Sequence, residues 1–338
     1  MRMWQYLLLS LLFTTCQNRQ LTENESLSIA FGSCNDQDLP QPLWKEILKV
    51  QPDLWVWLGD NIYGDSEVSD TLVNKYKRQL LQSDYQKLRA SSEILGIWDD
   101  HDYGKNDGGK EYIGKVASQK AFLDFFDVPE NDVRRNRKGV YSAHQYSVGT
   151  VTVKIILLDA RYHRDSISKI DGVYQPNSMG TVLGQEQWAW LEEELVNSEA
   201  DIHILGGGIQ FISWEHRFEK WGNFPNERNR LFNLIASTGA KGVILLSGDR
   251  HLAEVSAINW PGVSYPIRDI TSSGLTHSYE EIESEPNQHR ISPLIGLKNF
   301  GWIEITPAQN KIVIDVALKG QNDTTFFDTQ WTYALGTE

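Results

Sequence analysis

Apolar runs of strand length alternate with amphipathic stretches of helix length along most of the chain. We predict strands at 27–31, 53–60, 94–100, 141–148, 150–160, 202–211 and 241–249. We predict helices at 42–50, 69–82, 116–126, 184–197 and 227–236. The remainder of the chain favours strands and irregular loops. This alternation indicates an α/β fold, and the late run of strands predicts a second sheet packed on the first.

The first residues have the pattern of an export signal. Arg2 precedes an apolar run at 7–13 that is too short to span a bilayer. Two threonines then precede Cys16, as in the lipobox of a bacterial lipoprotein, where the cysteine is lipidated; a plain secretory signal is the alternative. We expect an exported protein of the periplasm or cell envelope, whose membrane contact is a lipid on Cys16. The predicted segments are a signal or lipobox at 1–16, a polar tether at 17–26 and one catalytic domain at 27–338.

Charge and cysteine content narrow the functional classes. The formal net charge of -13 over 338 residues argues against nucleic-acid backbones and anionic membrane surfaces as partners. The chain has two cysteines, and an exported protein normally pairs its cysteines or lacks them. Cys34 cannot form an internal disulfide once Cys16 is removed or acylated. Cys34 must therefore have a role other than forming a disulfide.

Side chains that can bind metals gather after four of the predicted strands. In α/β sheets ligands bind beyond the carboxyl ends of the strands, so these residues predict one converging site. A single Gly-Asp after a strand is usually a turn, but the recurrence of the pattern favours a site. Carboxylates at this density need a cation. The four groups are Cys34; Asp60, Asn61, Tyr63 and Asp65; Asp99, Asp100, His101, Asp102, Asn106 and Asp107; and Asp249 with His251.

The ligand types indicate a mixed metal site. Thiolate and phenolate suit a trivalent or borderline ion, whereas carboxylate and amide oxygens suit Ca²⁺, Mg²⁺ or Mn²⁺. Asp60 as a bridge would combine both sets. Two metals about 3.5–4 Å apart stabilise the attacking and leaving oxygens of in-line displacement at phosphorus.

Five ordered motifs then carry a family resemblance. They are GSC at Cys34, GDNIY at Asp60 and Tyr63, WDDHD around His101, LDAR at Arg161 and GDRH at His251. The sequence resembles the alkaline phosphatase D (PhoD-like) family of calcineurin-like metallophosphatases. The resemblance implies a four-layer αββα sandwich in which two mixed sheets are flanked by helices.

The resemblance also implies roles for individual residues. It assigns a ferric ion to Cys34, Asp60, Tyr63 and His251, and a calcium ion to Asp60, Asn106, Asp249 and Asp100. His101 resembles the histidine that assists phosphoryl transfer, Arg161 is a candidate phosphate clamp, and Asn61 is a candidate substrate contact. Asp102 replaces the family's glutamate, and Asn106 lies one place further from the histidine than usual. The first residues show no twin-arginine signal, which in relatives permits metal loading before export, so Zn²⁺, Mn²⁺ or Mg²⁺ stay alternatives to Fe³⁺ and Ca²⁺.

These features predict an exported metal-dependent phosphatase. Metal-bound hydroxide would attack the phosphorus of a small-molecule phosphomonoester, phosphodiester or both in line. One alternative is a hydrolase whose nucleophile is Cys34, with His101 or His251 as base. Another is a non-enzymatic, metal-stabilised surface protein that binds glycans through its tryptophans. Trp214 and Trp221 are interpreted either as cleft walls or as core residues, and no sequence signal indicates an oligomeric state.

Overall fold

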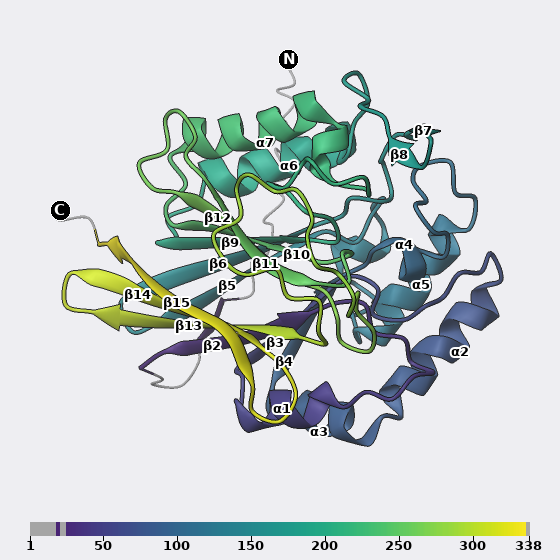
Figure 1. Ribbon diagram of the computed structural model, residues 1–338, viewed down its shortest axis with the longest axis horizontal. Helices are drawn as coiled ribbons and strands as arrows, with labels where there is room; N and C mark the ends of the chain where they lie inside the picture. Colours follow the sequence, from purple (N-terminus) through teal and green to yellow (C-terminus); the bar gives the residue numbers. More distant parts are fainter. Residues whose placement is uncertain (1–17, 21–24, 336–338) are drawn as a thin grey trace, which may run out of the picture.

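The computed structural model describes residues 18–20 and 25–335, in which two β-sheets pack against each other (Figure 1). The seven-stranded sheet runs, in spatial order, β1 (Asn18–Gln20), β5 (Ser142–Val148), β6 (Val151–Leu158), β9 (Ile202–Gly207), β10 (Val243–Ser247), β12 (Ile267–Ser272) and β11 (Ala253–Ile258). The six-stranded sheet runs β15 (Thr325–Ala334), β14 (Lys311–Lys319), β13 (Phe300–Ala308), β2 (Leu27–Gly32), β3 (Leu54–Leu58) and β4 (Glu93–Ile97). A separate ribbon pairs β7 (Lys169–Ile170) with β8 (Val173–Tyr174).

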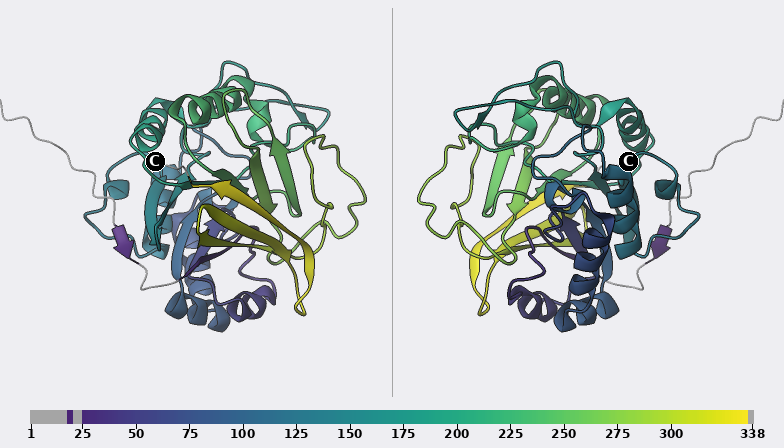
Figure 2. Two further views of the ribbon diagram at one scale, coloured as in Figure 1. Left: turned by 90° about the vertical axis from the view of Figure 1, so that its left-hand side faces the viewer. Right: turned by 90° about the vertical axis from the view of Figure 1, so that its right-hand side faces the viewer.

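Helices cover the outer faces of the two sheets. The α-helices are α1 (Leu43–Lys49), α2 (Ser69–Leu80), α3 (Ser83–Ser91), α4 (Asp100–Tyr103), α5 (Lys115–Phe125), α6 (Gly184–Val196) and α7 (Pro225–Thr238), with short 3₁₀ turns at Val133–Arg135 and Trp221–Asn223. In Figure 1, α6 and α7 lie above the seven-stranded sheet, and α1 and α3 lie below the six-stranded sheet. The perpendicular views in Figure 2 show the same layering. The expected four-layer arrangement of two mixed sheets between helices is confirmed.

Strand burial explains the sequence pattern. Every residue of β3 is buried, because β3 lies between the parallel strands β2 and β4 and has both faces covered. By contrast, β14 and β15 belong to an antiparallel meander with one open face, and their exposure alternates along each strand. The continuous apolar runs therefore mark the parallel part of the sheet, where strand ends can carry a site.

Most of the tryptophans among the described residues lie in the hydrophobic core. The ring of Trp44 on α1 packs edge-on against Trp55 and Trp57 of β3, with ring centroids 5.0 and 5.2 Å apart. Trp221 is fully buried under α7 and belongs to the core rather than to a cleft wall, whereas Trp214 is half exposed. Aromatic packing of this kind, rather than ligand binding, accounts for much of the tryptophan content.

Several predicted boundaries differ from those in the structure. Helix α2 ends at Leu80, and a further helix, α3, follows it. The hydrophobic periodicity of the sequence did not predict α3. The strand predicted at 202–211 ends at Gly207, because the chain turns there against Asp99: a Cβ on Gly208 would overlap the Asp99 carboxylate. Helix α7 exceeds its predicted span at both ends. Pro225 lies in its first turn, and Gly239 closes it in the left-handed conformation, with φ of 66°.

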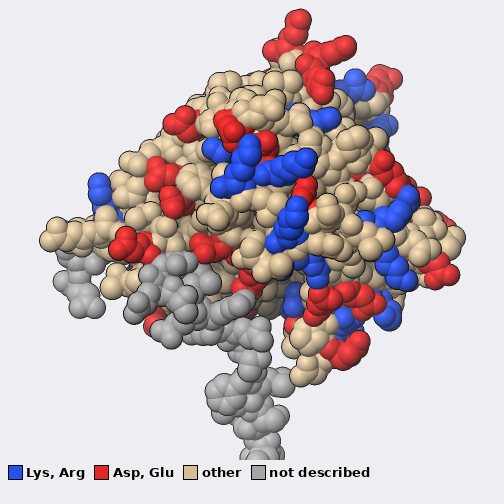
Figure 3. All heavy atoms as spheres, turned by 90° about the horizontal axis from the view of Figure 1, so that it is seen from below, with Lys and Arg blue, Asp and Glu red and all other residues tan. Residues whose placement is uncertain are grey.

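The structure describes only part of the N-terminal segment for which predictions were made. Residues 1–17, including Cys16, lie outside the described residues. Within the predicted tether, β1 pairs in parallel with β5. Across residues 18–20 and 25–335, we find no helix with the length and apolar character that crossing a membrane requires. On the face shown in Figure 3, basic and acidic side chains are intermingled.

Candidate metal centre

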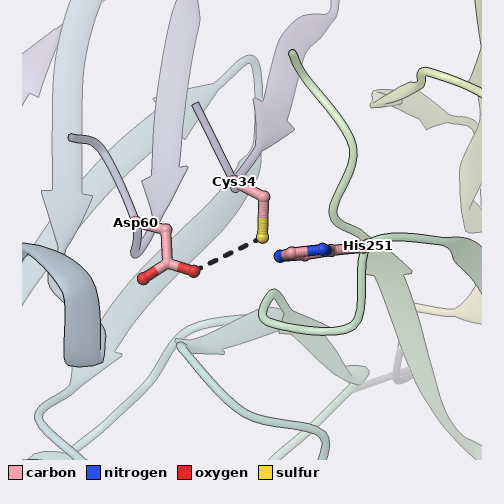
Figure 4. Close-up of side chains that lie close together, drawn as sticks. All are labelled: Cys34, Asp60 and His251. Carbon is pink, nitrogen blue, oxygen red and sulfur yellow. Dashed lines mark hydrogen bonds between the residues drawn. The ribbon is translucent and has the colours of Figure 1, made fainter. Parts of the chain in front are cut away.

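The predicted site residues converge from both sheets. Cys34 follows β2 and Asp60 follows β3, while Asp100 lies at the start of the short helix α4 directly after β4. Asp249 and His251 follow β10, which belongs to the other sheet. Figure 4 shows Cys34, Asp60 and His251 pointing toward one another from these separate strand ends. The centre therefore lies where carboxyl ends of the two sheets meet.

The backbone at this centre adopts an unusual conformation. Cys34, Asp60, Asp249 and His251 have φ angles of 59°, 48°, 69° and 53°. Residues other than glycine rarely enter this left-handed region, and each such residue costs about 1–3 kcal/mol that the surrounding structure must offset. Four of the predicted metal ligands thus occupy strained positions. Strain concentrated in this way is typical of a functional site.

The ligand atoms form three overlapping groups, in each of which they lie within 4.8 Å of one another. The first group combines a thiol, a carboxylate and an imidazole, and the third is entirely carboxylate. Asp60 belongs to the first two groups and Asp100 to the last two, so the groups form a continuous chain. The groups are Cys34, Asp60 and His251; Asp60, Asp100 and His101; and Asp99, Asp100 and Asp249.

Direct contacts link the members of the first group. The Cys34 Sγ lies 3.4 Å from Asp60 Oδ2, the contact drawn in Figure 4. The Tyr63 hydroxyl lies 3.1 Å from His251 Nε2, which brings the predicted phenolate ligand to the same place. The Ser273 hydroxyl lies 3.5 Å from Cys34 Sγ and accepts a hydrogen bond from the His251 backbone. Thiol, carboxylate, phenol and imidazole are therefore adjacent.

The electrostatics of these groups call for a cation. Burial raises the pKa of Cys34 to about 11 and raises the pKa of Asp60 and of Asp249 well above the usual range. Asp99 Oδ2 and Asp100 Oδ1 are buried without a hydrogen-bond partner among the described residues. Buried carboxylate oxygens without partners are costly, and a bound cation would stabilise the ionised forms. The residues present fit metal ions.

His101 is fixed beside the ligand groups. Its Nδ1 lies 2.7 Å from Asp65 Oδ1, and its ring packs against Tyr63 with centroids 4.1 Å apart. Its backbone N–H donates to Asp60 Oδ1 at 3.3 Å. Burial alone would lower the pKa of His101, but the carboxylates of Asp60, Asp65 and Asp100 outweigh it and raise the pKa to about 11. Asp65 was expected near the converging site, but its pairing with His101 was not predicted.

Asp102 organises the loops that present the carboxylates. Its Oδ1 accepts hydrogen bonds from the backbone N–H groups of Asp60 and Asp99, at 3.2 and 2.7 Å. Its Oδ2 accepts from the Tyr76 hydroxyl at 3.3 Å. Gly59, with φ of 89°, allows the backbone before Asp60 to lie close to Asp99, because a Cβ at position 59 would overlap Asp99. The residue that departs from the family's glutamate is thus the internal support of the site.

Arg161 is completely buried between two carboxylates. Its Nε lies 2.6 Å from Asp99 Oδ1, and its Nη1 lies 2.6 Å from Glu219 Oε2. Its Nη2 has no hydrogen-bond partner among the described residues. The predicted phosphate contact stays a prediction; the ion pairs give Arg161 a second role, which is to hold Asp99 in place. Glu219, 58 positions along the chain, carried no sequence signal for this pairing.

The two asparagines predicted at the site, Asn61 and Asn106, differ in burial and in their contacts. Asn61 is buried, and its Nδ2 donates to the Ile97 carbonyl at 3.0 Å, which ties the ends of β3 and β4 together. Asn106 is exposed, and its Nδ2 donates to Asp107 Oδ2 at 2.9 Å. The structure therefore brings Asn61 to the centre as a support, whereas the Asn106 side chain is exposed and contacts the neighbouring Asp107. The predicted substrate contact of Asn61 and the predicted metal contact of Asn106 stay predictions.

Two packed mixed sheets with metal-ligand residues at their meeting strand ends define a metallophosphatase-like fold. The family model described as PhoD-like phosphatase matches residues 29–284. The chain belongs to the PhoD-like phosphatase family, and the resemblance seen in its motifs is confirmed.

Individual relatives agree with this assignment. Alkaline phosphatase D of Bacillus subtilis (strain 168) is 24% identical over 276 residues, a stretch covering 69% of this chain and 47% of the relative. The chain thus spans about half the length of that curated relative. The solved structure of PhoD superposes with a TM-score of 0.71 at 20% identity, covering 92% of this chain and 70% of that one. The likeness confirms the fold.

Proposed function

We propose that this protein is a metal-dependent phosphoric ester hydrolase that acts on small-molecule phosphomonoesters, phosphodiesters or both. The observation that carries the proposal is the position of Asp60. It belongs both to a ligand group containing a thiol and an imidazole and to a group rich in carboxylates. A carboxylate shared between two such groups is suited to bridging two ions, and family membership supports the same chemistry.

We assign the ligands to two cations. Cys34, Asp60, Tyr63 and His251 would hold the first, for which Fe³⁺ is the ion implied by the resemblance. Asp60, Asp100 and Asp249, together with Asn106, would hold the second, for which Ca²⁺ is implied. Asp99 is a further ligand suggested by its position in the third group. When bound, such a pair of cations neutralises charge that develops on the attacking and leaving oxygens.

The surrounding residues orient and protect this chemistry. Asp65 holds His101 through Nδ1, so Nε2 is the ring nitrogen that can carry a proton to or from the ester oxygen that leaves. Arg161 holds Asp99, and Asp102 holds the backbone of Asp60 and Asp99. These contacts fix the carboxylates before a substrate arrives, which is how an active site stabilises its transition state electrostatically.

The alternative functions fit the structure less well. A cysteine nucleophile needs an accessible thiol with a lowered pKa, but Cys34 is completely buried and burial raises its pKa to about 11. A glycan platform needs several exposed tryptophan rings, but most of the described tryptophans are buried. Both observations favour the phosphatase.

We further propose that the protein is exported and is held at the cell envelope by a lipid on Cys16, with 27–338 as one catalytic domain. Support comes from the charged and apolar residues that precede Cys16. Metabolic labelling with a radioactive fatty acid tests it. Label in the wild type and none in Cys16→Ala is expected, whereas label retained in Cys16→Ala would contradict the anchor.

The first experiment on function combines elemental analysis with turnover. The purified protein is analysed for metals and assayed with p-nitrophenyl phosphate and bis-p-nitrophenyl phosphate, before and after EDTA. We expect a stoichiometric transition metal with calcium, and activity lost on chelation; the two rates rank monoester against diester. Metal with no turnover of either ester would favour a binding protein, and turnover that survives EDTA would favour the Cys34 hydrolase.

A further inference from the structure

A second group of polar side chains adjoins the metal centre and has no role in the function described so far. It consists of His216, Lys220 and Arg250, whose exposed fractions are 3%, 4% and 1%. Arg250 lies between the candidate ligands Asp249 and His251 in the chain. The Phe218 ring connects the group, because its centroid is 4.1 Å from the Arg250 guanidinium carbon and 6.2 Å from the His216 ring centroid.

These side chains have unused hydrogen-bonding capacity. Neither ring nitrogen of His216 has a partner among the described residues, and the same is true of Arg250 Nε. Lys220 Nζ donates one hydrogen bond, to the Phe218 carbonyl at 2.8 Å, although an ammonium has three donors. Nearly all buried polar groups in proteins have partners, so this concentration of unused donors indicates that something binds here.

The charges around these three side chains favour the binding of an anion. Arg250 Nη2 is paired with Glu285, at 2.6 and 2.7 Å from its two oxygens, and the nearby Glu219 is paired with Arg161 and Arg164. Within residues 18–20 and 25–335, Lys220 has no carboxylate within ion-pair distance. Burial, followed by the positive charge of Arg250, lowers the pKa of Lys220 to about 8. A buried cation with no directly paired carboxylate is costly, and an arriving anion would remove that cost.

We propose that His216, Lys220 and Arg250 form a subsite for a second phosphate group of the substrate. The inference rests on the proposed function: the metal centre takes the phosphate that is cleaved, and this subsite takes a phosphate on the organic part. The ammonium and the guanidinium are the side chains that commonly bind phosphate, and imidazole adds a further donor. The preferred substrates are therefore phosphate esters whose alcohol carries another phosphate.

The test compares two substrates that differ in one phosphate. Propyl phosphate and propane-1,3-diyl bisphosphate are hydrolysed by the metal-loaded protein, and kcat/KM is measured from released inorganic phosphate. We expect the wild type to prefer the bisphosphate. Lys220→Met should lower the ratio of the two kcat/KM values by about 10- to 100-fold, the scale of one hydrogen bond to a charged group. Lys220→Arg, which keeps the charge, should retain most of the ratio.

Lys154→Met is the matched control, because Lys154 on β6 is also buried but is paired with Glu194 of α6. It should leave the ratio unchanged. Equal ratios in the wild type, Lys220→Met and Lys220→Arg would overturn the subsite, even if both substrates are hydrolysed.

A binding measurement separates this inference from the proposed function. Calorimetry with propylphosphonic acid and propane-1,3-diylbisphosphonic acid needs no turnover. Absence of hydrolysis of both esters, together with no turnover of bis-p-nitrophenyl phosphate, would reject the phosphatase, while tighter binding of the bisphosphonate that is lost in Lys220→Met would still support the subsite. Bisphosphonate binding equal in the wild type and Lys220→Met would reject the subsite.

Discussion

Replacement of Arg161 by methionine tests whether ion pairing holds the carboxylates of the metal centre in place. Arg161, Asp99 and Glu219 are all essentially inaccessible to solvent, and the two ion-pair distances are 2.6 Å. Methionine keeps much of the side-chain length but removes the charge and the hydrogen bonds to Asp99 and Glu219. Glu219 keeps a second cation, Arg164, at 2.9 Å. Asp99 would be left without a cationic partner among its described contacts.

The size of the effect follows from this geometry. Removing one partner of a buried ion pair costs about 3–5 kcal/mol, because the other charge stays buried and uncompensated. We expect Arg161→Met to lower the free energy of unfolding by that amount. Asp99→Asn in the same chain should restore part of the loss, because it removes the charge that Arg161 compensated. The coupling between the two positions should fall within about 0.5–3 kcal/mol, as for residues in direct contact.

Urea unfolding followed by tryptophan fluorescence measures these changes. EDTA is present throughout, so that metal binding does not contribute to stability. Arg78→Met is the control, since Arg78 pairs with Asp38 at the surface and exposed pairs contribute little. If Arg161→Met unfolds at the same urea concentration as the control, or if Asp99→Asn adds to the loss, Arg161 does not hold Asp99 by ion pairing.

Three further substitutions test other parts of the structure. Asp60→Asn removes the shared charge of two ligand groups; elemental analysis should show loss of at least one metal, and kcat/KM should fall by at least about 100-fold. Gly208→Ala places a Cβ against the Asp99 carboxylate and should lower stability by about 1–3 kcal/mol in urea unfolding, whereas wild-type stability would mean that Asp99 can move freely. Burial raises the pKa of Asp269 to about 6, so the folded state binds more protons than the unfolded state between pH 4 and 6, and stability falls as pH rises through that window. Asp269→Asn should remove this fall, which amounts to about 3 kcal/mol at pH 7, and unchanged pH dependence of the urea midpoint would contradict the assignment.

Much of the fold was predictable because its signals are local. Apolar runs such as β3 are buried on both faces, so nearly every side chain in them is apolar whatever the rest of the chain does. The proline and glycine that bound α7 act through their own backbone angles. Helix α3 was missed because its apolar residues are few and widely spaced, and only packing against α1 and β3 makes it helical.

The candidate ligands were predictable for the same reason. Cys34, Asp60, Asp100, Asp249 and His251 each follow an apolar strand within a few residues, and strand ends in an α/β sheet converge. The sequence by itself thus determined which side chains reach the centre. Only the tertiary structure decided how they are held. The pairing of Arg161 with Glu219, the support from Asp102 and the cluster around Lys220 depend on loops that meet only after the two sheets have packed. Burial then sets the strength of these interactions. A charge that is removed from water is costly unless an ion pair, a metal ion or a bound anion compensates it.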